Sequence, residues 1–211
     1  NLETAAIANS VTEIADDAFE GCEKLTIYCN EDSYAKNYAE EKGIKVSTLI
    51  VDTIPNQTYT SKKIEPELKV STASQILGKR DYKADYYNNI NVGSANVIVK
   101  GTGDFSMLMT KADFRIIARN ISDAEVKNIP TQTLGESPCT PTVTVKYNGK
   151  TLEEGKDYTL TYKDNSKAGT ASVTVQGKGN FKGKMTVRFE IKEGDTRIEV
   201  FFKKVIKFFV A

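Results

Sequence analysis

The sequence contains no histidine among its 211 residues. Histidine is the usual base of nucleophilic catalysis and a common zinc ligand, so its absence removes the default chemistry of most hydrolases. The three cysteines, Cys22, Cys29 and Cys139, show no Cys-x-x-Cys spacing and have no histidine to complete a metal set. We therefore expect no catalytic residue, no metal and no cofactor. We interpret the cysteines as buried free thiols, while a Cys22–Cys29 disulfide stays open as the alternative in an exported protein.

Two further classes of function are excluded by what the chain lacks. Its net charge is only +1, whereas binding to a phosphate backbone needs an excess of Lys and Arg. It also has no run of about 18 apolar residues, the length that a membrane-spanning helix needs. We expect neither nucleic acid as a partner nor a transmembrane segment.

An internal duplication organises most of the chain. Ile54-Pro55-x-Gln57-Thr58 returns 75 residues later as Ile129-Pro130-x-Gln132-Thr133. Within the two blocks, DYKADYYNNINVGSANVIVKGTGDF from residue 81 matches DYTLTYKDNSKAGTASVTVQGKGNF from residue 157, with one extra residue in the preceding loop. A module repeated in tandem without shared catalytic residue types is typical of a spacer or a binding surface.

Both blocks show the two-residue period of half-buried β-strands. In the second block this period covers four runs: 143–147, 158–162, 171–175 and 187–191. Turn sequences such as Asn148-Gly149 separate the runs, and we predict a small antiparallel sandwich for each block. The first block has residues 71–76 in place of the Asn-Gly turn, so the pattern does not fix its first hairpin.

The first 47 residues follow a different pattern. Between Val11 and Ile27 the apolar residues are spaced as neither a helix nor an alternating strand would place them. Such spacing is typical of a solenoid coil, in which each strand and turn buries one or two residues against the next coil. Ser33 then precedes a predicted helix at 34–42, with Gly43 as a left-handed C-cap. The shared face of that helix consists of Ala35, Tyr38 and Ala39.

The coil pattern resembles a known family. The stretch with Val11-Thr12-Glu13-Ile14, Ala18-Phe19, Cys22, Leu25 and Ile27 resembles one leucine-rich repeat of the BspA-like bacterial surface proteins. In that family a helical segment closes the last coil, which would otherwise expose an apolar face. Because a stable solenoid needs about three repeats, the resemblance implies further coils before Asn1.

The duplicated blocks resemble a second kind of module. Both blocks contain the motif Asp-Tyr-x-x-x-Tyr-x-x-Asn-x-x-x-Gly, followed by an alternating strand and Gly-x-Gly-x-Phe. The resemblance that this motif supports covers nearly all of residues 54–192. The motif is similar to the small immunoglobulin-like repeats that follow leucine-rich repeats in surface proteins of Gram-positive, Clostridia-type gut bacteria. The resemblance implies an extracellular or cell-surface location.

The predicted fold class is therefore mainly β, with four parts. Residues 1–47 form a leucine-rich repeat coil and C-terminal cap of a short strand plus a helix. Residues 48–118 and 119–193 form two tandem small antiparallel immunoglobulin-like β-sandwiches, and residues 194–211 form an amphipathic cationic tail.

The tail carries the candidate contact residues. As a helix, it would place its lysines opposite its phenylalanines. The candidates are Phe201, Phe202, Lys203, Lys204, Lys207, Phe208 and Phe209. We expect residues 197–211 either to touch a membrane surface or a partner's groove, or to pack on the second sandwich or a neighbouring chain.

Other patterns that resemble chemical sites have structural interpretations. Paired acids at 16–17, 40–41 and 153–154 are expected on solvated faces rather than in glycoside hydrolysis. The Gly-x-Gly segments at 101–103 and 177–179 are expected to be turns rather than phosphate loops. Calcium ligation by Asp157, Asp164 and Asn165 stays open. Tyrosines could stack on sugars, but Tyr87 alone is expected to lie outside the core face.

These observations lead to two function hypotheses. The first is a non-catalytic bacterial surface protein fragment that serves in adhesion, with the sandwiches as stalk or spacer. Its partner would be a host or bacterial surface protein or glycan. The alternative is an ancillary module of a cell-wall or carbohydrate-active enzyme whose catalytic domain lies outside this chain.

Overall fold

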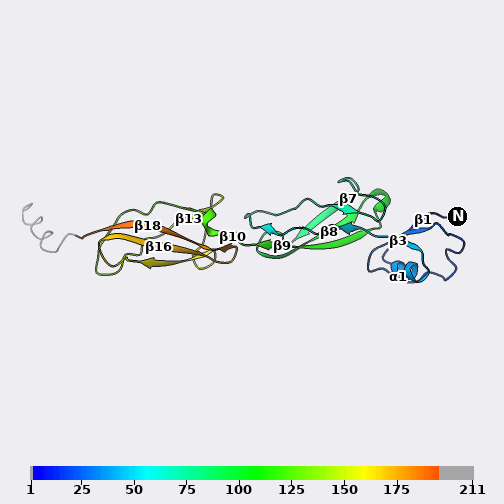
Figure 1. Ribbon diagram of the computed structural model, residues 1–211, viewed down its shortest axis with the longest axis horizontal. Coiled ribbons are helices and arrows are strands. Elements are labelled where there is room, and N and C mark those ends of the chain that lie inside the picture. The colour runs from blue at the N-terminus through cyan, green and yellow to red at the C-terminus, as the bar shows by residue number, and fades with distance from the viewer. Residues whose placement is uncertain (1, 195–211) are drawn as a thin grey trace, which may run out of the picture. The chain divides into compact units, whose positions relative to one another are not determined.

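The computed structural model describes residues 2–194, and this part is mainly β with a single α-helix (Figure 1). The chain divides into two compact units, one ending at Ile117 and the other beginning at Ala118. The first unit contains an N-terminal coil and a β-sandwich, and the second contains the other copy of the sandwich.

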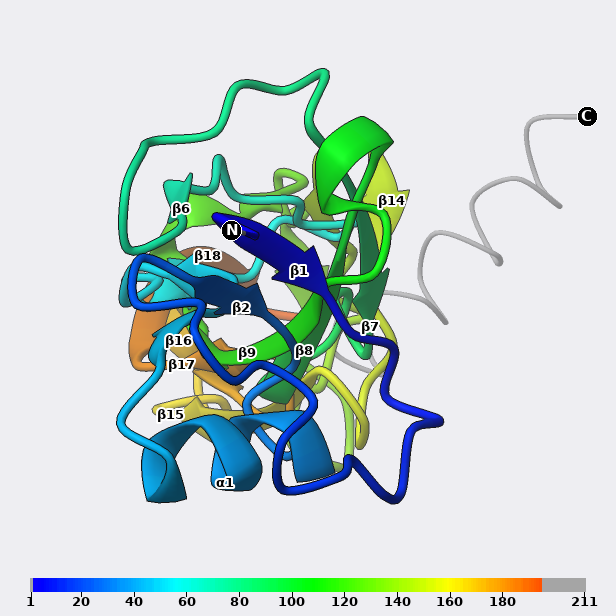
Figure 2. The same ribbon diagram turned by 90° about the vertical axis from the view of Figure 1, so that its right-hand side faces the viewer.

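The N-terminal coil is built on three short parallel strands. These are β1 (Thr4–Ala6), β2 (Thr26–Tyr28) and β3 (Lys45–Ser47), hydrogen-bonded in that order. Their register aligns Thr4 with Thr26 and Thr26 with Lys45, so successive turns of the chain stack in the same direction. Figure 2 shows helix α1 (Tyr34–Glu41) beside this sheet. The core of the coil consists of Leu25, Ile27, Cys29, Ala35 and Ala39.

Helix α1 begins as predicted and ends one residue earlier than predicted, with Lys42 as its C-cap. The Ser33 hydroxyl accepts a hydrogen bond from the Lys36 backbone N–H at 3.2 Å, which satisfies one of the free donors of the first turn. Gly43 follows the C-cap with φ of 67°, the left-handed conformation that glycine adopts without steric cost. The predicted buried face is confirmed, because Ala35, Tyr38 and Ala39 are all buried.

Each sandwich contains one large sheet of four strands. In the first copy the order is β5-β9-β8-β7, and in the second it is β12-β18-β16-β15. The strands of the first copy are β5 (Gln57–Thr58), β7 (Tyr82–Tyr87), β8 (Gly93–Gly101) and β9 (Met109–Ile117). Those of the second copy are β12 (Gln132–Thr133), β15 (Tyr158–Lys163), β16 (Gly169–Gly177) and β18 (Lys184–Lys192).

Smaller elements complete the two copies. In the first copy β4 (Ile50–Val51) pairs with β6 (Val70–Ser71), and the short 3-10 helix η1 (Gly103–Phe105) follows β8. In the second copy β11 (Glu125–Val126), β13 (Val145–Tyr147) and β14 (Lys150–Thr151) form a small sheet. Its N-terminal segment β10 (Arg119–Asn120) pairs with β17 (Phe181–Lys182), and η2 (Ile121–Asp123) follows β10.

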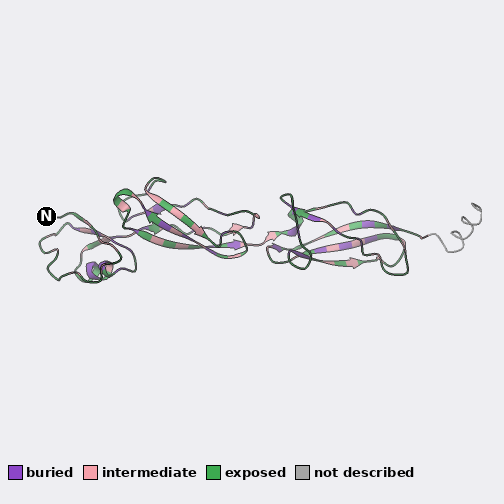
Figure 3. Cartoon of the chain, turned by 180° about the vertical axis from the view of Figure 1, so that it is seen from behind, coloured by how far each residue is buried: buried purple, intermediate pink, exposed green. Residues whose placement is uncertain are grey.

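The strand alternation follows the sequence period, and Figure 3 shows buried and exposed residues alternating along the long strands. The prediction of a purely antiparallel sandwich was wrong at one edge. Strands β5 and β12 run parallel to β9 and β18, so each large sheet is mixed. A two-residue period places side chains on a face but contains no information on strand direction, and no hairpin joins these strands to their neighbours.

The residues shared by the two copies make equivalent internal contacts. The Tyr86 hydroxyl donates to the Pro66 carbonyl at 2.6 Å, and the Tyr162 hydroxyl donates to the Pro141 carbonyl at 2.6 Å. The rings of Tyr86 and Tyr162 also meet a phenylalanine edge-on, with centroids 6.3 Å apart in each copy. The duplicated tyrosine therefore fastens the proline segment to the large sheet.

The duplicated asparagine and glutamine have structural roles too. Asn89 donates through its side-chain amide to the Ile64 carbonyl at 3.1 Å, and Asn165 does the same to the Cys139 carbonyl at 2.9 Å. Gln57 and Gln132 each bond back to the carbonyl of the proline two residues earlier, at 2.8 and 2.6 Å. The motif positions thus stabilise turns and strand entries in both copies.

The first hairpin of copy one forms despite its different turn. In copy two, Asn148 and Gly149 both have positive φ, as a tight two-residue hairpin turn requires. In copy one an isolated bridge joins Ser71 to Ile76, and the Leu77 N–H donates to the Val70 carbonyl at 2.9 Å. The Leu152 N–H donates to the Val145 carbonyl at the same distance in copy two.

All three cysteines are free thiols, so the Cys22–Cys29 disulfide is not formed. The expectation of burial is confirmed for Cys29 alone. Cys22 and Cys139 are half-buried, because each lies on a turn or loop at the edge of its core. Burial raises the pKa of the Cys29 thiol above its ordinary value.

Candidate functional site

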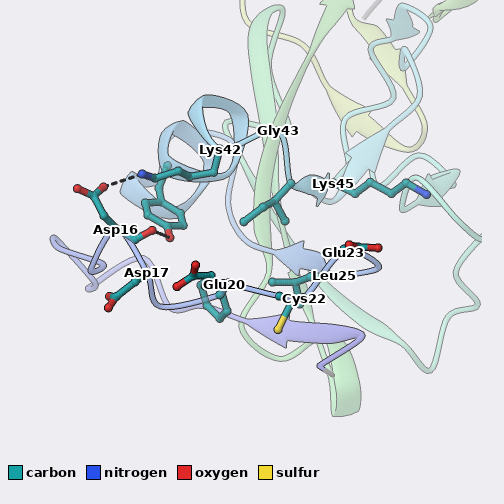
Figure 4. A pocket seen from close by; sticks show the side chains of 13 residues that line it. Asp16, Asp17, Glu20, Cys22, Glu23, Leu25, Lys42, Gly43 and Lys45 are labelled. Atoms are coloured by element: carbon teal, nitrogen blue, oxygen red, sulfur yellow. Dashed lines mark hydrogen bonds and ion pairs between the residues drawn. The ribbon is translucent and has the colours of Figure 1, made fainter.

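A cavity of about 580 Å³ lies on the N-terminal coil, between the turn at 16–25 and the end of α1 (Figure 4). Apolar side chains form its wall and charged side chains form its rim. The lining residues are Asp16, Asp17, Phe19, Glu20, Gly21, Cys22, Glu23, Leu25, Tyr38, Lys42, Gly43, Ile44 and Lys45.

The wall of this cavity is fixed by core packing. Phe19 and Tyr38 pack edge-on with ring centroids 6.2 Å apart. The Tyr38 hydroxyl donates to the Ala15 carbonyl at 3.1 Å, which ties the helix to the turn that precedes the cavity. Leu25 is buried beneath, so the wall belongs to the same core that stabilises the coil.

The rim contains an ion pair. Lys42 Nζ lies 2.7 Å from Asp16 Oδ1, and the same ammonium lies 5.8 Å from the centre of the Tyr38 ring. The hydrogen bond from Lys42 lowers the pKa of Asp16, and the same bond raises the pKa of Lys42. Asp16 is therefore ionised at neutral pH and has no proton to donate as a general acid.

The other rim residues surround an open mouth. Asp17, Glu20 and Glu23 add carboxylates, and Figure 4 shows Lys45 extending away from the Asp16–Lys42 pair. This arrangement offers an apolar wall beside charges of both signs. Carboxylates and ammonium groups around an apolar wall can form hydrogen bonds and ion pairs with a polar ligand.

Sequence reasoning did not single out this cavity. It placed Tyr38 on the buried helix face and Asp16 and Asp17 on a solvated turn, and both placements agree with the structure. It assigned no site role to the other charged residues of the rim, Glu20, Glu23, Lys42 and Lys45. No sequence spacing links Lys42 to Asp16, since 26 residues separate them and only the stacked coil brings them together.

The candidate contact residues of the tail, Phe201 to Phe209, lie outside the described residues, as do all positions from 195 onward. The tail hypothesis therefore stays a prediction.

The other patterns have structural roles where the structure describes them. The Asp157 carboxylate accepts a hydrogen bond from the Glu153 N–H at 3.0 Å, and the Asn165 side-chain amide donates one to the Cys139 carbonyl. No cluster of three or more Cys, Asp or Glu residues in the described range 2–194 is arranged to hold a metal ion. A Cβ at Gly101 would lie 2.0 Å from the Phe105 carbonyl oxygen, so this glycine permits a close turn.

The tyrosines divide as expected between core and surface. Tyr158 is buried, Tyr82, Tyr86 and Tyr162 are half-buried on the core face, and Tyr87 is 46% exposed. Tyr87 is thus the tyrosine of the duplicated blocks that faces outward.

Comparisons with known proteins give no family for this chain. No protein-family model and no curated protein matches it. A solved structure that it resembles, "Protocadherin gammaB7 EC3-6 cis-dimer structure", has 8% sequence identity and a TM-score of 0.22. The match covers 70% of this chain and 48% of that one. Within the described residues, no helix combines the length and apolar character needed to cross a bilayer.

Proposed function

We propose that this chain is a non-catalytic part of a bacterial cell-surface protein that serves in adhesion or in protein or glycan interaction. In this proposal the N-terminal coil is the end of a BspA-like leucine-rich repeat solenoid. The two immunoglobulin-like sandwiches act as its stalk, and the partner is a surface protein or glycan of a host or of another bacterium.

The observation that carries the proposal is that the duplicated residues make contacts within their own copy. The tyrosine, asparagine and glutamine common to both copies bond to backbone groups of their own copy. Residues kept in both copies for internal contacts favour a repeated structural module over a repeated active site. The three stacked parallel strands of the coil support a solenoid end.

Two measurements test the proposal. Antibodies against the purified chain should label intact source cells as strongly as permeabilised ones, and protease added to intact cells should remove the signal. Labelling that requires permeabilisation would contradict the surface location.

The ancillary-module alternative predicts a different result. Under it, the parent protein would cleave peptidoglycan or a polysaccharide, and deletion of residues 48–193 would reduce activity on the insoluble polymer more than on soluble fragments. Under the adhesion proposal the parent protein releases no product from either substrate.

A further inference from the structure

The two sandwiches share their core but differ on one outer face. On the large sheet of copy one, the register places Tyr87 opposite Asn96 and Asn96 opposite Asp113, in one row across β7, β8 and β9. Paired residues of antiparallel strands point to the same side of a sheet, with Cβ atoms about 5 Å apart. The neighbouring pair Ala95–Phe114 is buried, so the Tyr87 row faces outward.

The equivalent row of copy two has a different chemical character. It consists of Lys163, Ser172 and Arg188. An aromatic ring, an amide and a carboxylate in copy one thus correspond to two cations and a small hydroxyl in copy two. Since both sheets have the same strand order, this difference is not required by the fold.

The row of copy one is accessible. Tyr87 is 46% exposed, Asp113 is exposed and Asn96 is half-buried. Within residues 2–194, no side-chain hydrogen bond engages the Tyr87 hydroxyl or the Asn96 amide. Asp113 forms an exposed ion pair with Lys111 at 3.1 Å, so the row has no uncompensated charge.

A cavity adjoins this row at the turn between β7 and β8. Its volume is about 350 Å³, and no charged side chain lines it. The lining residues are Asn88, Asn89, Ile90, Asn91, Val92 and Ser94. Ser94 is the next outward position on β8 before Asn96, so the cavity and the row share this strand, and the exposed Arg115 of β9 lies opposite Ser94.

The turn of copy two again serves as an internal comparison. Asn89 and Asn165 form equivalent hydrogen bonds, so the two turns are held in the same way. In this turn copy one exposes Ile90 and Val92, at 41% and 38%. Copy two has Ser166 and Ala168 at these positions.

We propose that the outer face of copy one, defined by Tyr87, Asn96, Asp113 and the turn at 88–92, binds a neutral sugar ring of a glycan, and that copy two does not. The Tyr87 ring supplies an apolar surface for the C–H face of the sugar. The carboxylate of Asp113 accepts hydrogen bonds from hydroxyl groups, and the Asn96 amide both donates and accepts. No charged side chain lines the adjoining cavity, which fits a ligand without net charge.

The inference rests on the proposed function only in naming a glycan as the partner. It assigns the stalk itself a binding role. The site is tested on the purified chain, whereas the cell-surface location is tested on intact cells, so the two can fail separately.

The test is a titration of the full chain, labelled with ¹⁵N, with three neutral hexasaccharides: cellohexaose, mannohexaose and N-acetylchitohexaose. A hexamer of polygalacturonate serves as the charged control. On an open face with few contacts, we expect a Kd of about 0.1 to 1 mM for at least one neutral sugar. Chemical-shift changes should cluster at residues 87–96 and 113 and be absent at 163–172 and 188.

Two matched variants decide whether Tyr87 is the stacking residue. Tyr87→Ala should weaken binding about tenfold or more, while Tyr34→Ala, which removes a tyrosine of similar 41% exposure on α1, should not change it. Circular dichroism melting should show both variants folded. The proposal is overturned if no neutral sugar shifts these signals, if only the charged hexamer does, or if Tyr87→Ala binds like the wild type. It is also overturned if sedimentation shows that Tyr87→Ala abolishes a dimer, since the face would then bind a second copy.

Discussion

The Tyr162 hydroxyl donates a 2.6 Å hydrogen bond to the Pro141 carbonyl, and its ring meets Phe189 edge-on. We expect Tyr162→Phe to keep the ring packing and lose the hydrogen bond. The net cost should be about 1 kcal/mol of unfolding free energy for the second unit. Urea unfolding measures it, with the exposed Tyr34→Phe as the control. Equal stability of Tyr162→Phe and wild type would show that water replaces the lost bond.

Tyr162 and two other tyrosines make the free energy of unfolding depend on pH. Burial raises the pKa of Tyr86, Tyr158 and Tyr162 above the ordinary value. The folded state then holds these protons more tightly than the unfolded state, whose tyrosines titrate near pH ~10. Their stabilising contribution is complete below that pH and is lost as pH rises through the folded pKa.

We therefore expect the free energy of unfolding to fall from about pH 10 upward, where the unfolded tyrosines begin to ionise. Urea titrations on both sides of this pH measure the effect. Tyr162→Phe should lose less stability than the wild type over the same interval. An identical loss in the two proteins would attribute the effect to other groups.

The cysteines should differ in reactivity. Cys29 is fully buried and burial raises its pKa, whereas Cys22 and Cys139 are half-buried. Thiolate is the reactive form, so native protein at mildly alkaline pH should be alkylated by iodoacetamide at Cys22 and Cys139 before Cys29. Peptide mass spectrometry after timed quenching measures the order in which the three cysteines are alkylated. Labelling of Cys29 as fast as of Cys139 would mean that the coil core opens readily.

At the scale of elements, the turn after β17 depends on a glycine. Gly183 has φ of 73°, and a Cβ there would lie 2.6 Å from Asn120 Oδ1 of β10. We expect Gly183→Ala to destabilise the second unit by about 1 to 2 kcal/mol through backbone strain alone, with displacement of Asn120 adding to it. Gly135→Ala is the control, since its φ is ordinary and its Cβ would meet open space. Thermal melting of both variants gives the comparison.

Elements with a strong local signal were predictable from the sequence. Ser33, the apolar spacing and Gly43 define α1, and alternation defines β8 and β16. The parallel pairing of Gln57 with Ile116 was not predictable, because a period fixes faces and not directions. The Asp16–Lys42 pair and the Tyr87 row were missed for a related reason: each depends on register or stacking between segments distant in sequence.

At the scale of the whole chain, the first unit joins two structures of different kinds. Asn30, at the end of the coil's second strand, is buried, and its side-chain oxygen accepts from the Met109 N–H of β9 at 2.6 Å. A second contact joins the Tyr28 ring of the coil to the Phe105 ring of the first sandwich, with centroids 6.4 Å apart. The coil, whose core is small, thus gains support from the first sandwich.

This contact predicts that the coil and the first sandwich open together. Asn30→Ala leaves the Met109 N–H without its acceptor in a partly buried place, which should cost about 1 to 3 kcal/mol. The exposed Asn37→Ala on α1 serves as the control. Hydrogen exchange followed by mass spectrometry on the full chain should show peptides from 25–47 and 93–117 losing protection in parallel in the wild type. In Asn30→Ala the coil peptides 25–47 should exchange faster than they do in the wild type. If the coil peptides of the wild type exchange early while β8 and β9 stay protected, the coil is an independent cooperative unit, and its stability must come from elsewhere than the sandwich.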